Sequence, residues 1–357
     1  MKKIDNKNKK NPLKKIFIKI CRLFGYEIID QTNFSVPTRE KSLSENLNIQ
    51  GKRSITLPLG ETKISRKVSA FTVIYRSCTN INMLTQNKKR LFGMEKSEYT
   101  FRSLNSIISS LRKAKTYFPK IEFNIIVVDY NSKKSDLDKI QAQLDNSNVK
   151  NSLISLDINE FVNKIKKTNQ KNEAVTENQK SNMANIHKSF SLAKTQCKDL
   201  VYFVEDDYLH EKESITEMIF AYERISSQTE DELILCPADY PYLYAKANPT
   251  NIFLGSSRHW RVVDETLCTF LTSTNIIKKY WDTFISMCEF EHYPFEKPLH
   301  EIYQKQYCLS PIPSLALHCT NINSVFGLSP NVNWKKIWDE NKNYLLLKQK
   351  KQPLLIF

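Results

Sequence analysis

The chain has 357 residues, of which 41% are hydrophobic, so it can bury the core of one large domain or two small ones. Its formal net charge of +15 is compatible with nucleic acid, anionic lipid or a phosphorylated substrate as partner. The sequence lacks an apolar run of the ~18 residues that a membrane span needs, a C-x-x-C metal pattern, and the glycine spacing of dinucleotide and Walker sites.

The beginning of the chain predicts a basic amphipathic helix. Residues 1–22 contain nine Lys or Arg and a single acid, Asp5. Apolar residues recur at helical spacing between Pro12 and Gly25, where the helix would end: Leu13, Ile16, Phe17, Ile20, Leu23 and Phe24. Such a helix either packs on a folded domain or lies on an anionic membrane surface. We expect no signal peptide, and the eight scattered cysteines are typical of reduced thiols in a cytoplasmic protein.

Residues 30–66 show no sustained period and indicate a linker, so an ordered domain is expected from Val68 onward. The pattern predicts strands over residues 70–76, 123–129, 152–156, 200–204, 232–237, 266–273 and 311–318. It predicts helices over residues 99–115, 136–144, 181–195, 214–225, 276–287 and 299–306. Because strands and helices alternate, we expect an α/β fold with a mainly parallel sheet and right-handed crossovers.

The most informative motif lies between Leu200 and Tyr208, where a β-rich apolar run ends in Glu205, Asp206 and Asp207. Carboxylates do not stay ionised inside a core, so the acids should lie at the strand's carboxyl end, where open α/β sheets bind ligands. Three adjacent carboxylates repel one another unless a cation joins them, and hard oxygen ligands favour Mg²⁺ or Mn²⁺. A solvated acidic turn is the alternative interpretation.

In their order along the chain, these features resemble a GT-A type glycosyltransferase, the Rossmann-like kind that uses nucleotide-sugars, over residues 68–325. The resemblance is carried by four elements: the opening strand with Arg76, the strand that ends at Asp129 before Asn131 and Ser132, the helix over residues 182–191, and the acidic triplet.

The resemblance implies a role for each of these residues. The triplet corresponds to the family's DXD-like motif, which binds a divalent cation that bridges the two phosphates of a nucleotide-sugar. Asp207 would contact the metal, Asp206 would face the ribose or the sugar, and Glu205 would assist. Asp129 would contact the nucleotide base or ribose, and Arg76 is a further candidate for donor binding.

Sugar transfer from a diphosphate requires neutralisation of the leaving group's charge, and an inverting reaction also needs a carboxylate that takes the acceptor proton. By the resemblance, this base lies at the start of a helix before the last core strand, where Glu301 is the first candidate and Glu296 a substitute. Asp264 is the second candidate for the base. His318, at the end of an apolar strand, is either a metal ligand or structural, and Arg261 is a candidate phosphate contact.

The predicted organisation is a basic tail, amphipathic helix and linker over residues 1–66, a GT-A domain over residues 67–329, and a peripheral C-terminal extension over residues 330–357. We expect an enzyme that uses Mn²⁺ or Mg²⁺ to transfer a hexosyl group, with inversion favoured. The donor would be a nucleotide-diphosphate sugar, and the acceptor a glycan or lipid-linked saccharide in surface polysaccharide synthesis. It would act in the cytoplasm, with possible peripheral contact at the inner face of the cytoplasmic membrane.

Two alternatives belong to other functional classes. A sugar-phosphate nucleotidyltransferase also needs metal-binding acids, but such enzymes usually carry a glycine-rich phosphate loop, which is missing after Tyr75. A non-enzymatic basic adaptor would bind anionic membrane or nucleic acid through the basic ends of the chain, although we expect no specific nucleic-acid partner.

Overall fold

The computed structural model describes residues 12–26, 48–49, 53–56, 60–80, 90–245, 250–320, 322–342 and 344. The chain divides into two units, one of Met1–Lys67 with Glu223–Glu230 and the other of Val68–Tyr222 with Asp231–Phe357. The second unit contains the large sheet and the site described below.

The helices and short 3-10 helices are as follows: α1 (Pro12–Leu23), η3 (Leu91–Gly93), α2 (Lys96–Tyr117), α3 (Lys134–Asp145), η4 (Ile158–Phe161), α4 (Glu177–Gln196), α5 (Ser214–Thr229), η5 (Pro241–Tyr244), α6 (Thr274–Lys279), α7 (Trp281–Glu289), α8 (Lys297–Tyr303) and α9 (Trp334–Glu340). The strands are β1 (Asn48–Ile49), β2 (Arg53–Thr56), β3 (Gly60–Lys63), β4 (Ala70–Ser77), β5 (Glu122–Asp129), β6 (Lys150–Ser155), β7 (Leu200–Glu205), β8 (Tyr208–His210), β9 (Ile234–Leu235), β10 (Ile252–Leu254), β11 (His259–Val262), β12 (Phe270–Ser273), β13 (Cys308–Ile312) and β14 (Ala316–His318).

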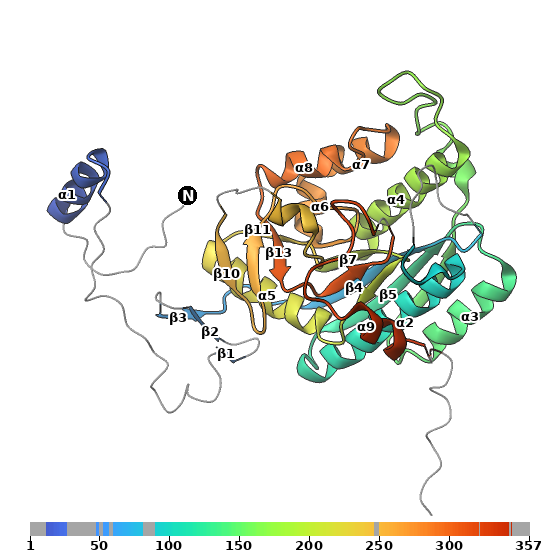
Figure 1. Cartoon of the computed structure of the whole chain (residues 1–357), viewed down its shortest axis with the longest axis horizontal. Helices are drawn as coiled ribbons and strands as arrows, with labels where there is room; N and C mark the ends of the chain where they lie inside the picture. Colours follow the sequence, from blue (N-terminus) through green and yellow to red (C-terminus); the bar gives the residue numbers. More distant parts are fainter. Residues whose placement is uncertain are drawn as a thin grey trace, which may run out of the picture. The chain divides into compact units, whose positions relative to one another are not determined.

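The second unit is built on a nine-stranded sheet in the order β10-β11-β13-β9-β12-β7-β4-β5-β6 (Figure 1). Strands β6, β5, β4 and β7 are parallel neighbours, and β9 pairs in parallel with β13. Strand β12 runs antiparallel to both β7 and β9, and β11 runs antiparallel to β10 and β13. The predicted α/β class with a mainly parallel central sheet is confirmed.

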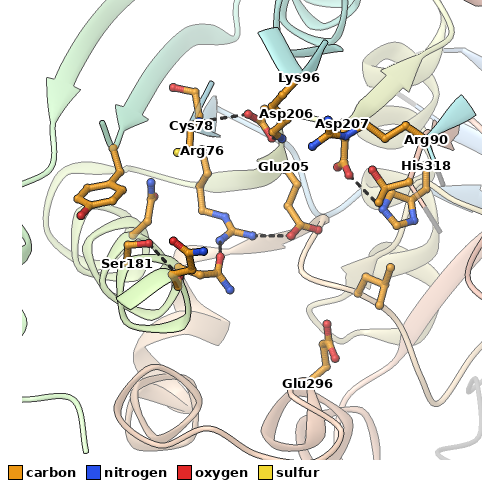
Figure 2. Close-up of a pocket in the computed structure, with 17 residues that line it drawn as sticks. Arg76, Cys78, Arg90, Lys96, Ser181, Glu205, Asp206, Asp207, Glu296 and His318 are labelled. Carbon is orange, nitrogen blue, oxygen red and sulfur yellow. Dashed lines mark hydrogen bonds and ion pairs between the residues drawn. The ribbon is translucent and has the colours of Figure 1, made fainter. Parts of the chain in front are cut away.

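Strands β4 and β7 are in register, so their carboxyl ends finish at the same edge of the sheet. Arg76 on β4 is the Cα partner of Glu205 on β7, and Ser77 on β4 is the partner of Asp129 on β5. The buried apolar residues before these positions hold the strands in the core, and polar side chains begin where the strands leave it. Figure 2 shows Arg76 and Glu205 facing each other at this edge.

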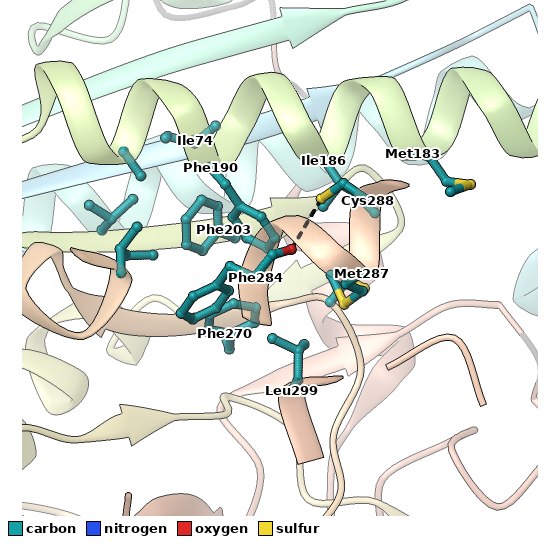
Figure 3. Close-up of a cluster of buried hydrophobic side chains, with 14 of the residues drawn as sticks. Ile74, Met183, Ile186, Phe190, Phe203, Phe270, Phe284, Met287, Cys288 and Leu299 are labelled. Carbon is teal, nitrogen blue, oxygen red and sulfur yellow. Dashed lines mark hydrogen bonds between the residues drawn. The ribbon is translucent and has the colours of Figure 1, made fainter. Parts of the chain in front are cut away.

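The two faces of the parallel strands are covered by different helices. On one face, Tyr75 donates a hydrogen bond to the backbone oxygen of Thr100 in α2 at 2.8 Å. On the other face, the ring of Phe190 from α4 packs edge-on against Phe203 of β7 and Phe284 of α7, each at 5.0 Å between centroids (Figure 3). Each large side chain buried in this way contributes on the order of 1.5–3 kcal/mol, so this aromatic cluster fixes α4 against the sheet.

The final strand of the predicted domain differs from its expected form. The stretch over residues 311–318 is divided into the end of β13 and the separate strand β14, which pairs with β8 outside the large sheet. Pro311 and Pro313 lack the N–H groups that a continuous central strand would need, which explains the interruption. The division brings His318 beside Tyr208, which is its register partner in β8.

The first unit contains helix α1, which agrees with the predicted helix. Gly25 adopts a φ of +83°, the left-handed conformation that ends a helix and that glycine adopts without a Cβ clash. Strands β1, β2 and β3 form a small antiparallel sheet within the segment predicted as linker. Most of residues 27–59 lie outside the described part of the chain. Among the described helices, none combines the length and the apolar character required to cross a bilayer.

Candidate active site

A cavity of about 320 Å³ opens at the carboxyl edge of β4 and β7. Its walls come from these two strand ends, the first turns of α4, and the start of α2 with the residue Arg90 before it (Figure 2). Tyr130 after β5, Leu267 before β12, the residue that precedes α8 and the residues around the end of β14 complete them. All three acids of the predicted triplet line it. The cavity therefore lies where the sequence pattern placed a ligand site.

Arg76 forms the base of the cavity together with Glu205. One guanidinium nitrogen of Arg76 donates to Glu205 Oε1 at 2.9 Å, and another donates to Asn182 Oδ1 in α4 at 2.9 Å. The side chain of Arg76 is only 7% exposed, so these two partners satisfy a charge that burial would otherwise disfavour. Arg76 and Glu205 thus fix α4 to the sheet edge and set the shape of the cavity.

Asp206 is held by donors from the protein. Its Oδ2 accepts from the Cys78 backbone N–H at 3.1 Å and from the Thr100 hydroxyl at 2.9 Å, and its Oδ1 forms an ion pair with Lys96. Burial opposes the charge on Lys96, but the carboxylates of Asp206 and Asp207 outweigh that effect and raise the pKa of Lys96. Asp206 therefore lines the cavity and anchors a charged lysine at its wall.

Asp207 and His318 form a second pair at the cavity. Asp207 Oδ2 lies 3.4 Å from His318 Nε2. His318 Nδ1 is 3.0 Å from the backbone oxygen of Phe326, a geometry in which Nδ1–H donates and Nε2 faces Asp207. The imidazole also stacks on Tyr208, with 4.7 Å between ring centroids. Three contacts therefore fix the orientation of this histidine.

The electrostatics of this pair favour opposite charges. Burial opposes the ionisation of Asp207, but His318 and Lys96 outweigh it and hold the pKa of this carboxyl below its usual range. Burial also opposes protonation of His318, yet the Asp207 carboxylate outweighs it and raises the pKa of the imidazole. A divalent cation would have to displace the proton on His318 Nε2, and it would then meet this nitrogen and the ionised oxygen of Asp207 at one point.

These residues fit a divalent metal only as part of a shared site. No group of three or more His, Cys, Asp or Glu side chains is placed to hold a metal anywhere in the described residues. Asp207 and His318 offer two ligands, and Mg²⁺-type sites commonly combine one or two carboxylates with water and substrate phosphates. The donor set therefore suits a metal that is completed by a phosphorylated ligand.

Arg90 and Lys96 place two cations at the cavity wall next to this pair. Arg90 precedes η3, and Lys96 is the first residue of α2. The guanidinium of Arg90 lies over the ring of Tyr99, at 5.8 Å from its centroid. Guanidinium and ammonium groups near a cavity recognise phosphate oxygens, and neither residue was among the predicted site residues. They were missed because residues 81–95 show no period that would place them beside the acids.

Two predicted donor contacts lie outside the cavity. Asp129 is 2% exposed and accepts hydrogen bonds from the hydroxyls of Ser77 and Ser132, at 2.6 and 2.5 Å, so it joins the ends of β4 and β5 from behind the site. Arg261 forms an ion pair with Asp239. The structure thus gives both residues protein partners and places neither of them at the cavity.

The two first candidates for a catalytic base are also outside the cavity. Asp264 and Glu301 are both exposed and line no part of it. Glu296, the substitute, does line it, from the position that caps the N-terminus of α8. Figure 2 shows its carboxylate pointing into the cavity from the side opposite Glu205. Glu296 precedes α8 at its N-cap position, whereas Glu301 lies within the helix on its exposed side.

Comparisons with known proteins give structural matches only. No family model and no curated protein matches the sequence. Solved structures that match include the galactosyltransferase LgtC in complex with donor and acceptor sugar analogs, at 11% identity and a TM-score of 0.32, covering 66% of this chain and 65% of that chain. Staphylococcus aureus TarS 1–349 matches at 14% identity and a TM-score of 0.33, covering 62% of this chain and 55% of that chain. A UTP-bound UGPase from Acinetobacter baumannii matches at 10% identity and a TM-score of 0.39, covering 80% of this chain and 95% of that chain.

The matched region spans less than two thirds of the LgtC and TarS chains. LgtC is a galactosyltransferase, and the matched UGPase is bound to UTP. At this level of identity and TM-score they carry no argument about activity, which has to be argued from the cavity itself.

Proposed function

We propose that this protein is a glycosyltransferase that transfers a sugar from a nucleotide-diphosphate sugar. The proposal is supported by one observation above all: the Asp207–His318 pair, Arg90 and Lys96 line the same cavity at the sheet edge. Such a cavity combines ligands for a divalent cation with donors for phosphate oxygens, which are the two requirements of a diphosphate leaving group.

The proposed metal is Mn²⁺ or Mg²⁺, with Asp207 and His318 as its protein ligands. When bound, such a cation supplies positive charge that stabilises a diphosphate as it leaves. Asp207 provides the ionised oxygen, and the hydrogen bond from His318 Nδ1 to Phe326 keeps Nε2 directed at the same point. Asp206 acts indirectly, because it holds Lys96 at the cavity wall.

Glu296 is proposed as the general base of an inverting transfer. An acceptor hydroxyl attacks the anomeric carbon, the bond from that carbon to the donor phosphate breaks, and the nucleoside diphosphate leaves with the electron pair. Glu296 takes the proton of the hydroxyl. We place the sugar between the donor phosphates and Glu296, whose carboxylate lies across the cavity from Glu205 in Figure 2.

A glycan or lipid-linked saccharide in surface polysaccharide synthesis is proposed as acceptor, with the reaction at the inner face of the cytoplasmic membrane. The membrane location is supported by α1, where Phe17 and Leu23 are 58% and 85% exposed, and by Phe24 directly after the helix, which is 75% exposed. A basic helix with such an apolar face suits the surface of an anionic bilayer. This contact is proposed as peripheral, since none of the helices that the structure describes is long and apolar enough to cross a bilayer.

Nucleotidyl transfer from a nucleoside triphosphate to a sugar phosphate is the alternative activity. The connection after β4 argues against it, because the chain has no glycine between Gly60 and Gly93 to form a glycine-rich phosphate loop. The non-enzymatic adaptor would bind through the basic ends of the chain, and it gives no role to the paired charges that line the cavity.

A thermal-shift panel tests the proposal. UDP, GDP, CDP and ADP, and the corresponding nucleotide-sugars, are added to the protein with and without Mn²⁺. Because a ligand that binds the folded state stabilises it by mass action, at least one diphosphate should raise the melting temperature more with Mn²⁺ than without. Stabilisation by a nucleoside triphosphate together with a sugar 1-phosphate, and by none of the diphosphates, would support the alternative activity instead.

A further inference from the structure

The segment that carries Arg90 and Lys96 contains an unusual backbone position. Phe92, in the 3-10 helix η3 between them, has a φ of +74°. A phenylalanine in this left-handed region is strained, so surrounding contacts must hold it there. Leu91 N–H donates to the backbone oxygen of Cys319 at 2.9 Å, and the hydroxyl of Tyr99 donates to the backbone oxygen of Leu91.

The contacts that hold Phe92 come from the far end of the chain. Its ring stacks on Trp338 of α9, with 4.2 Å between centroids and 17° between planes. Trp338 also packs against Tyr99, at 5.1 Å, and Tyr99 is the ring over which Arg90 lies. The Trp338 indole therefore contacts both Phe92, in the turn after Arg90, and Tyr99. The Tyr99 ring in turn lies beneath the Arg90 guanidinium.

Helix α9 is itself fixed to α2, the helix that begins with Lys96. The guanidinium of Arg102 lies 3.9 Å from the Trp338 ring centroid and donates to the Trp338 backbone oxygen at 2.8 Å. Asn105 donates to Asn341 at 2.9 Å, so a second contact holds the end of α9. Trp338 is 6% exposed, which shows that the docking is tight.

We propose that α9 positions the cationic edge of the cavity, with Trp338 as the positioning residue that keeps Arg90 and Lys96 in place to bind a diphosphate. The identity of that anion as the donor's diphosphate rests on the proposed function. The positioning itself concerns an anion site and can be tested without a nucleotide. Helix α9, within the segment predicted as a peripheral extension, is then a functional part of the site.

The test measures the affinity of the full-length protein for inorganic pyrophosphate by calorimetry. Trp338→Ala should weaken binding by about tenfold or more, the effect of one displaced charge-assisted contact. Trp338→Phe keeps a ring in the stack and should stay within about threefold of the wild type. Phe92→Gly is a second route to the same loss, because glycine accepts the positive φ but removes the ring that joins the turn to α9.

Trp281→Ala is the matched control. Trp281 packs under Lys194, at the opposite end of α4 from the cavity, so this variant should lose stability without losing pyrophosphate affinity. The proposal is overturned if the wild type binds no pyrophosphate, if Trp338→Ala and Phe92→Gly bind as well as the wild type, or if Trp281→Ala weakens binding equally. If pyrophosphate binding behaves as expected and no nucleotide in the panel binds, the proposed function fails while the role of α9 stands.

Discussion

Asp207 is the residue on which the proposed metal site depends most. Replacing it with Asn keeps the shape of the side chain but removes the ionised oxygen opposite His318. We expect transfer to fall by about 10²-fold or more, and Mn²⁺ affinity by about 10–100-fold, because the site offers only two protein ligands. Turnover assays and Mn²⁺ titrations measure the two effects.

Asp264→Asn is the control for this variant, because Asp264 is exposed and outside the cavity. It should behave as the wild type in both assays. Full Mn²⁺ dependence and unchanged turnover in Asp207→Asn would remove this carboxylate from the mechanism.

The same Glu→Gln substitution should change kcat strongly at Glu296 and hardly at Glu301, although the two residues are only five positions apart. Glu296→Gln cannot accept a proton, and loss of a general base typically lowers kcat by about 10²–10⁴-fold. Donor affinity should hardly change, since Figure 2 shows Glu296 away from Arg90, Lys96 and the Asp207–His318 pair, which are proposed to bind the donor diphosphate. Glu301→Gln, on the exposed face of α8, should retain kcat within about threefold, far less than loss of a base would cost. The reverse pattern would return the base to Glu301.

His210 predicts how stability responds to acid. It is buried, with Nε2 2.5 Å from the Tyr202 hydroxyl, and burial lowers its pKa to about 3 from an ordinary 6.5. Between these two values the unfolded chain binds a proton that the folded protein does not. This residue therefore makes stability fall as pH drops from 6.5 towards 3, by about 1.4 kcal/mol per pH unit.

Denaturant unfolding at several pH values measures this slope. His210→Gln retains hydrogen-bonding groups without titrating, so stability of this variant should decline less steeply below pH 6.5 than that of the wild type. The comparison of slopes isolates the contribution of His210, because the other titrating groups are the same in both proteins. His318 acts in the opposite sense, since its raised pKa makes stability fall as pH rises above 6.5. Identical slopes would show that His210 does not remain neutral in the folded state.

Among the helices and strands, α1 has a proposed role, binding to an anionic membrane surface, that a simple experiment can test. Full-length protein should co-sediment with vesicles that contain phosphatidylglycerol, and salt should weaken the association. Each basic residue near such a surface contributes about 1 kcal/mol, and salt screens this contribution. Deletion of residues 1–26 should release the protein from vesicles and leave transfer to a soluble acceptor intact.

The competing interpretation is that α1 packs on a folded domain. Pure phosphatidylcholine vesicles are the control, since they lack the anionic charge. Failure of the full-length protein to bind any vesicle, together with a melting temperature several degrees lower after the deletion, would contradict the membrane role.

Strands and helices could be predicted from the sequence where the local pattern of apolar residues determines them. The apolar run from Phe123 to Val128 and the spacing of Phe101, Leu104 and Leu111 specify a buried strand and a helix face without tertiary information. The direction of β12 could not be predicted, because an apolar strand reads the same in parallel and antiparallel pairing.

At the scale of the whole molecule, the acids of the site were predictable but their partners were not. An ionised triplet at the end of a buried strand identifies a cleft by local reasoning alone. Arg90 and Lys96 reach the same cavity through a strained turn held by α9, and the contact between Arg102 and Trp338 joins residues 236 positions apart. No spacing rule reports a contact over such a distance. Glu296 was identified only as a substitute because the start of α8 decides which carboxylate faces inward.

A crystal structure of the protein with Mn²⁺ and the nucleoside diphosphate that stabilises it most tests the central claim directly. The account predicts anomalous density for the metal between Asp207 and His318, and the diphosphate beside Arg90 and Lys96 in the cavity at the edge of β4 and β7. A nucleotide bound elsewhere on the chain, with this cavity empty at saturating concentrations, would contradict it.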